Sequence, residues 1–435
     1  MISAEQNELM THTGAETPAG RLMRLYWQPV ALAEELQGVR PVRPVRLLGE
    51  EFVLFRDEAG RLGLLDRHCP HRGADLAFGR REDGGLRCVF HGWLFDVAGR
   101  CLETPAEPEE SPLRTRIRQR SYPVIERGGI VFAYLGPGEP PALPHFDCFI
   151  APDTHCFAFK GFIACNWLQA LEVGIDPAHA SYLHRFFEDE NPEASYGRQF
   201  RAVSADSDLP MTQLLRTHGR PRLEVERTPY GMQLVALRTL DAARTHVRVT
   251  NMIFPHGFVI PLSPTMTISQ WHVPVDDTRC YWYAIFTSFA GAVDKATMRR
   301  QRLELYSLPD YMPRLNQSNN YGFDPDEQLH RTFTAMGTDI NVHDQWAIES
   351  QGPIHDRTRE TLGYSDTAIA LYRRILLDAI AGARRGERPL MVLTQEEAAR
   401  LRGPAAIDGI GPTDAWQQYW RDADAERRKT ASWSA

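Results

Sequence analysis

The 435-residue sequence lacks several features that would assign it to a particular class of proteins. Its longest apolar runs, such as residues 129–135 and 257–262, have the length of a strand and fall far short of the roughly 20 apolar residues of a membrane span. The amino-terminal residues are polar and acidic, without the basic and apolar segments of a signal peptide. The formal net charge is −7, and no basic stripe is present. We therefore expect neither a membrane nor a nucleic acid as a partner.

The sequence also lacks cysteines at paired spacing. It contains seven cysteines, an odd number. Cys69 and Cys88 belong to the metal-binding motifs described next, and the other five show no paired spacing. Free thiols are more typical of a reducing compartment than of an oxidising one, so we expect a cytoplasmic location.

Two short loops each combine one cysteine with one histidine. Cys69 precedes His71 by two positions, Cys88 precedes His91 by three, and sixteen residues lie between the loops. A structural zinc site usually pairs cysteine with cysteine and histidine with histidine, so the mixed pairs disfavour zinc. They suit a [2Fe–2S] cluster in which histidines replace two cysteines on one iron, which raises the reduction potential. A glycine soon after each histidine lets the backbone approach such a cluster. These loops predict an electron acceptor.

A second group of metal-binding side chains lies at Asp176, His179 and His184. Asp176 followed by Pro177 is a helix-start signal, and under that interpretation the histidines are ordinary helix residues. However, these three ionisable groups fall within nine residues of an otherwise apolar stretch. A spacing of five does not put both histidines on one face of a regular α-helix, so shared ligation requires the helix to end or widen between them.

A possible third ligand lies far downstream. Two histidines and one distant carboxylate form the facial triad of non-haem Fe(II) oxygenases, which leaves coordination positions open for O2 and substrate. The segment of residues 339–352 offers Asp339, His343 and Asp344 as candidates. The spacing alone does not choose among them.

The chain divides into three parts by composition. Residues 1–35 predict a helical lead-in, and residues 36–150 predict a small antiparallel β domain of short hairpins with the cluster loops at hairpin tips. Residues 151–435 predict a second domain in which an antiparallel sheet is covered by helices, an α+β arrangement. Within it we expect helices at 168–187, 295–308, 367–381 and 395–401. The charged tail after residue 413 is expected to be poorly ordered or to lie across a neighbouring subunit.

These motifs together resemble the large (α) subunit of Rieske non-haem iron oxygenases over essentially the full length, and most closely its phthalate dioxygenase branch. Respiratory Rieske proteins are less similar, because they carry an extra cysteine near each loop where this chain has Ala74 and Phe90. The resemblance implies Asp344 as the third ligand to a mononuclear Fe(II), because Glu349 follows it by five residues. It also implies that Asp176 bridges to a Rieske histidine, by position His91, of an adjacent subunit.

The resemblance further implies an activity. Electrons from NAD(P)H would pass through a flavin/iron–sulfur reductase to the [2Fe–2S] Rieske cluster and then to Fe(II). There O2 would be added to an aromatic carboxylate such as phthalate, a chlorobenzoate or a phenoxybenzoate, giving a cis-dihydrodiol. The oligomer would be a homotrimer or stacked trimers. A Rieske monooxygenase or O-demethylase acting on an aromatic acid, a non-catalytic Rieske electron carrier and a protein with zinc at both sites are the alternatives.

A carboxylate held in an apolar pocket needs a cation, and arginine offers a planar two-pronged donor. Arg244 opens a predicted strand that should line the site, with Arg248 on the same face by alternation. A solvated arginine in a hairpin is the competing interpretation. We predict Arg244 as the substrate-binding residue.

Overall fold

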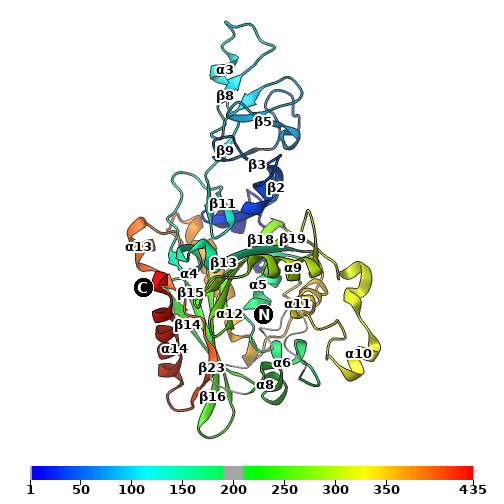
Figure 1. The fold of residues 1–435 in the computed structure, drawn as a ribbon, viewed down its shortest axis with the longest axis vertical. Coiled ribbons are helices and arrows are strands. Elements are labelled where there is room, and N and C mark those ends of the chain that lie inside the picture. Colours follow the sequence, from blue (N-terminus) through cyan, green and yellow to red (C-terminus); the bar gives the residue numbers. More distant parts are fainter. Residues whose placement is uncertain (1, 190–208, 435) are drawn as a thin grey trace.

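The computed structural model of the chain describes residues 2–189 and 209–434. Figure 1 shows a region of short strands at one end of the molecule and a larger region built on one long sheet at the other. The predicted α+β class is therefore confirmed, with a small antiparallel β unit preceding a sheet that helices cover. The domain limits after residues 35 and 150 stay a prediction.

The amino-terminal lead-in consists of two capped helices. In α1 (Ala4–Thr11) the Ser3 hydroxyl accepts from the Gln6 N–H, and the Gln6 side chain accepts from the Ser3 N–H. In α2 (Pro18–Met23) Thr17 is the cap, and the proline at the first helical position loses no hydrogen bond. Both helices contact α12 (Thr367–Arg384), so the lead-in packs against the larger region.

The small region contains three antiparallel sheets. The predicted short hairpins are present: in one, Phe52 pairs with Asp66, and in another, Ile125 pairs with Phe132. The sheets, in spatial order, are β1 (Trp27–Leu32), β11 (Ile130–Tyr134) and β10 (Val124–Arg127); β2 (Val42–Leu47), β3 (Glu50–Arg56), β4 (Leu62–Asp66) and β9 (Ser121–Tyr122); and β5 (Arg80–Glu82), β6 (Gly85–Arg87), β7 (Leu94–Phe95) and β8 (Cys101–Glu103).

An eight-stranded sheet forms the centre of the larger region, and its strands pair antiparallel. On β15 and β16 successive side chains alternate between its two faces. Leu237 and Val247 pack toward α14 (Trp416–Thr430), whereas Arg238 and Arg248 line a cavity on the other face. The order is β13 (Cys156–Ile163), β19 (Arg279–Ser288), β18 (Met266–Asp276), β17 (Gly257–Ser263), β16 (Arg244–Ile253), β15 (Gly231–Thr239) and β14 (Arg222–Thr228), with β23 (Asp408–Pro412) paired to β16.

The predicted single helix at 168–187 is wrong. Helix α5 (Trp167–Gly174) ends before Asp176, and a separate one-turn helix, α6 (Ala180–Leu183), follows. The break arises because Asp176 accepts a hydrogen bond from the Ala178 N–H, which starts a new turn there. The two histidines of the segment, His179 and His184, flank this one-turn helix.

The carboxy-terminal tail is also ordered, contrary to expectation. Helix α14 lies along one face of the sheet (Figure 1), while α5 and α11 (Ile340–Glu349) lie along the other. Trp416, Tyr419 and Trp420 of α14 pack against buried valines and leucines of β15 and β16. The tail is therefore an amphipathic helix whose apolar side covers the sheet of its own chain.

The other predicted helices are present. No helix within residues 2–189 and 209–434 has both the length and the apolar character that crossing a bilayer needs. Besides short 3-10 helices, the remaining α-helices and strands of the described residues are α3 (Leu113–Arg116), α4 (Asp147–Ile150), α8 (Met211–Thr217), α9 (Lys295–Leu305), α10 (Pro325–His330), α13 (Gln395–Arg400), β12 (His145–Phe146) with β22 (Arg402–Gly403), and β20 (Tyr306–Ser307) with β21 (Met312–Pro313).

Candidate metal centres and substrate cavity

The two cysteine–histidine loops share one backbone turn although their spacings differ. In each loop the cysteine N–H donates to the carbonyl of the fifth residue after it, and the fourth residue donates back to the cysteine carbonyl, all at 2.8–3.0 Å. The fourth residues are Gly73 and Gly92, whose φ angles of +74° and +77° favour glycine. The two loops therefore have the same hydrogen-bonded turn, and their histidine rings lie next to each other.

The four donor side chains of these loops gather by type. The Cys69 and Cys88 thiols are both buried and lie within hydrogen-bonding reach of each other. The His71 and His91 rings are 4.5 Å apart between centroids, and the Trp93 ring stacks on His71 at 4.5 Å and 6°. A cluster with thiolates on one iron and imidazoles on the other requires this separation.

The chemistry of the donors also fits iron. Burial, together with the neighbouring Cys88, raises the pKa of the Cys69 thiol to about 11, so the thiolate needs a cation to stabilise it. The His91 Nδ1 atom is buried and has no hydrogen-bond partner among the described residues. Bound iron would satisfy both groups.

The second centre lies where α6 faces α11. His179 and His184 cap the two ends of the single turn α6, and their side chains point the same way, with their Nε2 atoms 3.2 Å apart. The Asp344 Oδ1 atom on α11 is 3.5 Å from Nε2 of His179 and 3.1 Å from Nε2 of His184. Within the described chain, no other set of three histidine, cysteine or acidic residues meets the same closeness.

The two Nε2 atoms and the Asp344 Oδ1 atom form a triangle, which has the size of one face of an octahedral metal site. Three ligand atoms at about 2.1 Å from a metal, with perpendicular bonds, lie about 3.0 Å from one another. The two rival ligands have other roles in the structure. Asp339 caps α11 by accepting from the Asn341 N–H, and the His343 ring points to Gly337 and to the outer nitrogen of His184.

The electrostatics of the triangle call for a cation. Burial lowers the pKa of His179 and lowers that of His184 to about 3, so both rings are neutral and able to ligate. Burial raises the pKa of Asp344 to about 6, although His179 and His343 oppose this effect. A divalent ion would favour the ionised carboxylate. Fe(II) bound by two imidazoles and one carboxylate fits these donors.

Asp176 lies beside this triangle but is not part of it. Its Oδ1 accepts from the Ala178 N–H at 2.9 Å, and its Oδ2 is 3.8 Å from Nδ1 of His179. The Nδ1 atom of His179 is buried without a hydrogen bond from the described residues. Asp176 is not the helix cap that the Asp–Pro pair indicated, since His179 holds the N-cap position of α6. It is placed next to the outer nitrogen of His179, and its Oδ2 takes no part in the turn bond to Ala178.

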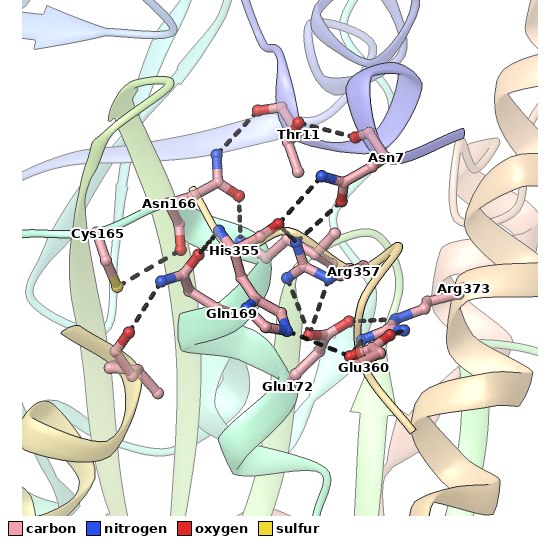
Figure 2. A network of polar contacts seen from close by, with 12 residues as sticks. Asn7, Thr11, Cys165, Asn166, Gln169, Glu172, His355, Arg357, Glu360 and Arg373 are labelled. Atoms are coloured by element: carbon pink, nitrogen blue, oxygen red, sulfur yellow. Dashed lines mark hydrogen bonds and ion pairs between the residues drawn. The ribbon is translucent and has the colours of Figure 1, made fainter. Parts of the chain in front are cut away.

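A buried polar network holds α5 in place (Figure 2). Glu172 lies between Arg357 and Arg373, with Oε2 2.9 Å from Arg357 Nη2 and Oε1 2.6 Å from Arg373 Nε. Burial alone would raise the pKa of Glu172, but the two guanidinium groups outweigh it and lower the pKa. Gln169 donates to the carbonyl oxygens of Ile348 and Gly352, which ties α5 to the end of α11.

The far end of α11 is anchored through Glu349. Its Oε1 accepts from the Ala164 N–H at 2.8 Å and from Gln345 at 3.1 Å, and its Oε2 accepts from the Tyr321 hydroxyl at 2.8 Å. Together with the network on α5, these bonds fix the helix that carries Asp344 relative to the helix that leads into His179.

A cavity of about 170 Å³ adjoins the triangle. His179, His184 and Asp344 form part of its wall, and most of the rest is apolar. The apolar wall includes Ile163, Leu215, Leu234, Phe258, Ile268 and Trp282. The size and lining suit a small aromatic molecule.

Three arginines also line the cavity, and they differ in how they are paired. Arg248 forms an ion pair with Asp408 and donates to the carbonyl of Pro261. The Arg302 guanidinium lies 5.2 Å from the Trp282 ring, and burial lowers the pKa of Arg302 to about 10.

Arg238 has no acidic partner among the described residues. It is 2% exposed, and its Nη2 donates only to the Pro177 carbonyl at 3.2 Å and the Ser181 hydroxyl at 3.4 Å. Its Nε and Nη1 atoms are buried without a hydrogen-bond partner. Burial and nearby Arg248 lower the pKa of Arg238 to about 10, so it remains a cation at neutral pH.

The structure does not bring Arg244 to the cavity. Its side chain is 63% exposed and pairs with Asp241 at 2.8 Å in the turn before β16. Alternation along β16 does direct Arg248 inward, but the cavity begins only at that part of the strand. Sequence reasoning missed Arg238. The only signal was that this charged residue directly follows the apolar stretch of residues 234–237.

Comparison with known proteins agrees with this arrangement. Residues 26–123 match the family model of the Rieske [2Fe-2S] domain, and residues 133–433 match that of the LigXa C-terminal domain like family. The chain is 36% identical to the phthalate 4,5-dioxygenase oxygenase subunit of Pseudomonas putida over 96% of its own length and 95% of that protein.

Two further relatives show how broad the similarity is. The chain is 32% identical to the 3-chlorobenzoate-3,4-dioxygenase oxygenase subunit of Comamonas testosteroni, covering 87% of this chain and 89% of the relative. It is 31% identical to the 5,5'-dehydrodivanillate O-demethylase oxygenase subunit of a Sphingobium species, covering 90% and 84%. The terminal oxygenase of carbazole 1,9a-dioxygenase from Nocardioides aromaticivorans IC177 shares the fold, with a TM-score of 0.56 and 20% identity over 87% of this chain and 98% of that one.

Proposed function

The chain belongs to the phthalate dioxygenase branch of the Rieske non-haem iron oxygenases as a terminal oxygenase component, and on this premise we propose that its substrate is an aromatic carboxylate. We further propose that Cys69, His71, Cys88 and His91 hold its [2Fe–2S] cluster. His179, His184 and Asp344 would hold the mononuclear Fe(II). Membership of an enzyme family excludes the non-catalytic electron carrier and the zinc protein that the sequence left open.

The observation that carries the substrate class is the unpaired guanidinium of Arg238. A buried charge without a partner is costly, and two of its donor atoms have none among the described residues. A carboxylate on an aromatic ring would supply a planar acceptor for the guanidinium and an apolar body for the rest of the cavity. Arg238 therefore replaces Arg244 as the proposed substrate anchor.

In this mechanism the side chains of the chain bind and orient. When bound, the cluster and the iron supply the electrons and the activation of O2. His179, His184 and Asp344 would hold the iron and, as such a triad does, would leave positions open for O2 and substrate. Arg238 holds the carboxylate and so fixes which ring carbons lie toward the triad, while the apolar walls exclude water.

We propose that catalysis needs an oligomer, a trimer or stacked trimers. The strands that carry the cluster loops lie at one end of the chain, and α6 and α11 lie toward the other (Figure 1). This separation within one copy favours electron transfer between copies. The uncommitted oxygen of Asp176 would meet His91 of the partner subunit and the outer nitrogen of His179.

An electron donor is the remaining partner. We propose a flavin/iron–sulfur reductase that docks near the cluster, where Val89 and Phe90 are 59% and 54% exposed. None of the seven cysteines, all of them among the described residues, forms a disulfide in the structure, which supports a reducing, cytoplasmic location.

Two outcomes of O2 activation are open to this site. Addition of both oxygen atoms to the ring gives a cis-dihydrodiol, which is our first proposal. O-demethylation of a methoxylated aromatic acid is the second, because the Sphingobium relative carries that activity in its name.

Isotope labelling separates them. The purified oxygenase, with a reductase, NADH and 18O2, is offered benzoate, phthalate, chlorobenzoates and methoxybenzoates, and products are analysed by mass spectrometry. Two 18O atoms in one ring product indicate dioxygenation. A phenolic acid without 18O, released together with formaldehyde, indicates O-demethylation. Oxidation of neutral arenes with no acid accepted would contradict the substrate class.

A further inference from the structure

His343 lies next to the proposed iron ligands without reaching the metal position. It is fully buried on α11, directly before Asp344. Its Nε2 is 3.0 Å from the carbonyl oxygen of Gly337, and its Nδ1 is 3.5 Å from Nδ1 of His184. Both ring nitrogens of His343 are thus committed to other groups, which explains why it is not itself a ligand.

The two rings are aligned for a direct hydrogen bond. The ring planes are inclined by 26°. The ring centroids are 5.7 Å apart and the Nδ1 atoms 3.5 Å apart, and the difference equals about two ring radii, so both Nδ1 atoms lie close to the line that joins the centroids. The nitrogens therefore point at one another.

The direction of this bond follows from the carbonyl at the far end. A carbonyl oxygen only accepts, so the Nε2 of His343 carries a proton. If the Nδ1 of His343 also donated, the Nδ1 of His184 would have to accept, and a neutral His184 would then carry its proton on Nε2. That tautomer has no lone pair for a metal on the atom that faces Asp344. If His343 accepts instead, His184 donates from Nδ1 and its Nε2 is free to ligate.

We propose that His343 is a positioning residue that holds His184 in its metal-binding tautomer and orientation. The proton order runs from His184 Nδ1 to His343 Nδ1, and from His343 Nε2 to the Gly337 carbonyl. This inference rests on the proposed function, because it takes His179, His184 and Asp344 as the iron ligands. Under this inference the outer nitrogens of the two histidine ligands face different groups. The Nδ1 of His179 faces the carboxylate of Asp176, and the Nδ1 of His184 faces the neutral imidazole of His343.

The test compares two substitutions of His343, one that removes the hydrogen-bond acceptor and one that keeps it. His343→Phe keeps a ring of similar shape and removes the acceptor. His343→Asn is smaller, but its side-chain oxygen can occupy the Nδ1 position and accept from His184. If His343 orients His184, the Phe variant should bind Fe2+ about 10- to 100-fold more weakly than the native protein, and the Asn variant should be close to native. If His343 only fills space, the order should reverse.

The measurement uses the full-length protein with its cluster in place. The mononuclear iron is removed by mild chelation, and Fe2+ is returned anaerobically in competition with a coloured chelator to obtain Kd. Urea unfolding of the same samples reports packing. His256→Phe is the matched control, because His256 is also a buried histidine, bonded to Gln28, but lies outside the cavity wall. Its Fe2+ affinity should match that of the native protein.

Each outcome decides the matter. A weak Phe variant with a near-native Asn variant supports the inference. An unchanged Phe variant, or an Asn variant no better than Phe, overturns it. His343→Leu serves the same comparison if the Phe variant does not fold. A native protein that binds no Fe2+, or binds it equally well after His184→Ala, refutes the iron site and the proposed function with it.

Discussion

Replacing Arg238 with methionine should separate stability from substrate binding. Lowering the pKa of a guanidinium from 12.5 to about 10 corresponds to about 3 kcal/mol of unfavourable burial at neutral pH. The penalty applies at every pH below the folded-state pKa, because the charged form is the one disfavoured. Against it stand the two hydrogen bonds to Pro177 and Ser181, worth about 1 kcal/mol each. The variant should therefore be as stable as the native protein, or about 1 kcal/mol more stable.

Substrate binding should change in the opposite direction. A charge-assisted hydrogen bond to a carboxylate contributes about 1.5–3 kcal/mol, which corresponds to about a 10- to 150-fold rise in KM when Arg238 is lost. The rise should appear for benzoates and phthalates. Neutral arenes of similar size should be affected little, because their contacts with the apolar wall remain.

The assay is NADH-dependent O2 uptake with benzoate and with toluene, beside urea unfolding of the same samples. Arg244→Met is the matched control: its guanidinium is 63% exposed and pairs with an exposed acid, an interaction of little energetic value. It should leave KM and stability unchanged. A normal benzoate KM for Arg238→Met would refute the anchoring role. A loss of more than about 2 kcal/mol of stability would assign Arg238 a structural role instead.

Three further predictions concern other parts of the site. Asp176→Asn should retain the turn bond from the Ala178 N–H and both metal sites but lose at least 90% of turnover, because asparagine accepts that bond as well as aspartate yet carries no charge; near-normal turnover would contradict the bridge. His71→Cys should lower the reduction potential of the cluster, since an anionic thiolate replaces imidazole, and voltammetry that finds no change would contradict the ligand assignment. Tyr321→Phe should destabilise the protein by about 1.5–3 kcal/mol in urea, because the buried Glu349 carboxylate loses a donor; equal unfolding midpoints would show that this bond does not anchor α11.

Sequence patterns revealed the parts of the molecule that depend on short spacing. The cluster loops are local, and each carries its own turn, so four candidate ligands could be named from two short motifs. The spacing of His179 and His184 predicted that the helix ends or widens between them; the chain instead interrupts the helix before His179, after Gly174, and forms a single helical turn between the two histidines. Their assignment as ligands stays a prediction.

Parts of the site that depend on long-range packing could not be predicted in this way. Asp344 is 160 residues from His184, and only the family resemblance separated it from Asp339 and His343. Alternation correctly directed Arg248 inward but could not say how far along β16 the cavity extends. Arg238 lies opposite His246 in a neighbouring strand, and that register is set by tertiary pairing.

The placement of two opposite charges distinguishes this cavity from an ordinary core. Arg238 is buried and Asp344 is half-buried, both line the cavity, and each has buried donor or acceptor atoms unsatisfied among the described residues, yet no ion pair joins them. A core selected only for stability would pair such groups or replace them with apolar side chains. Here separate supports keep them apart, since Asp344 is held through Glu349 on α11, whereas Arg238 is fixed by β15. The fold thus leaves one position that needs a cation and another that needs an anion, which is the arrangement that a metal ion and an aromatic carboxylate would complete.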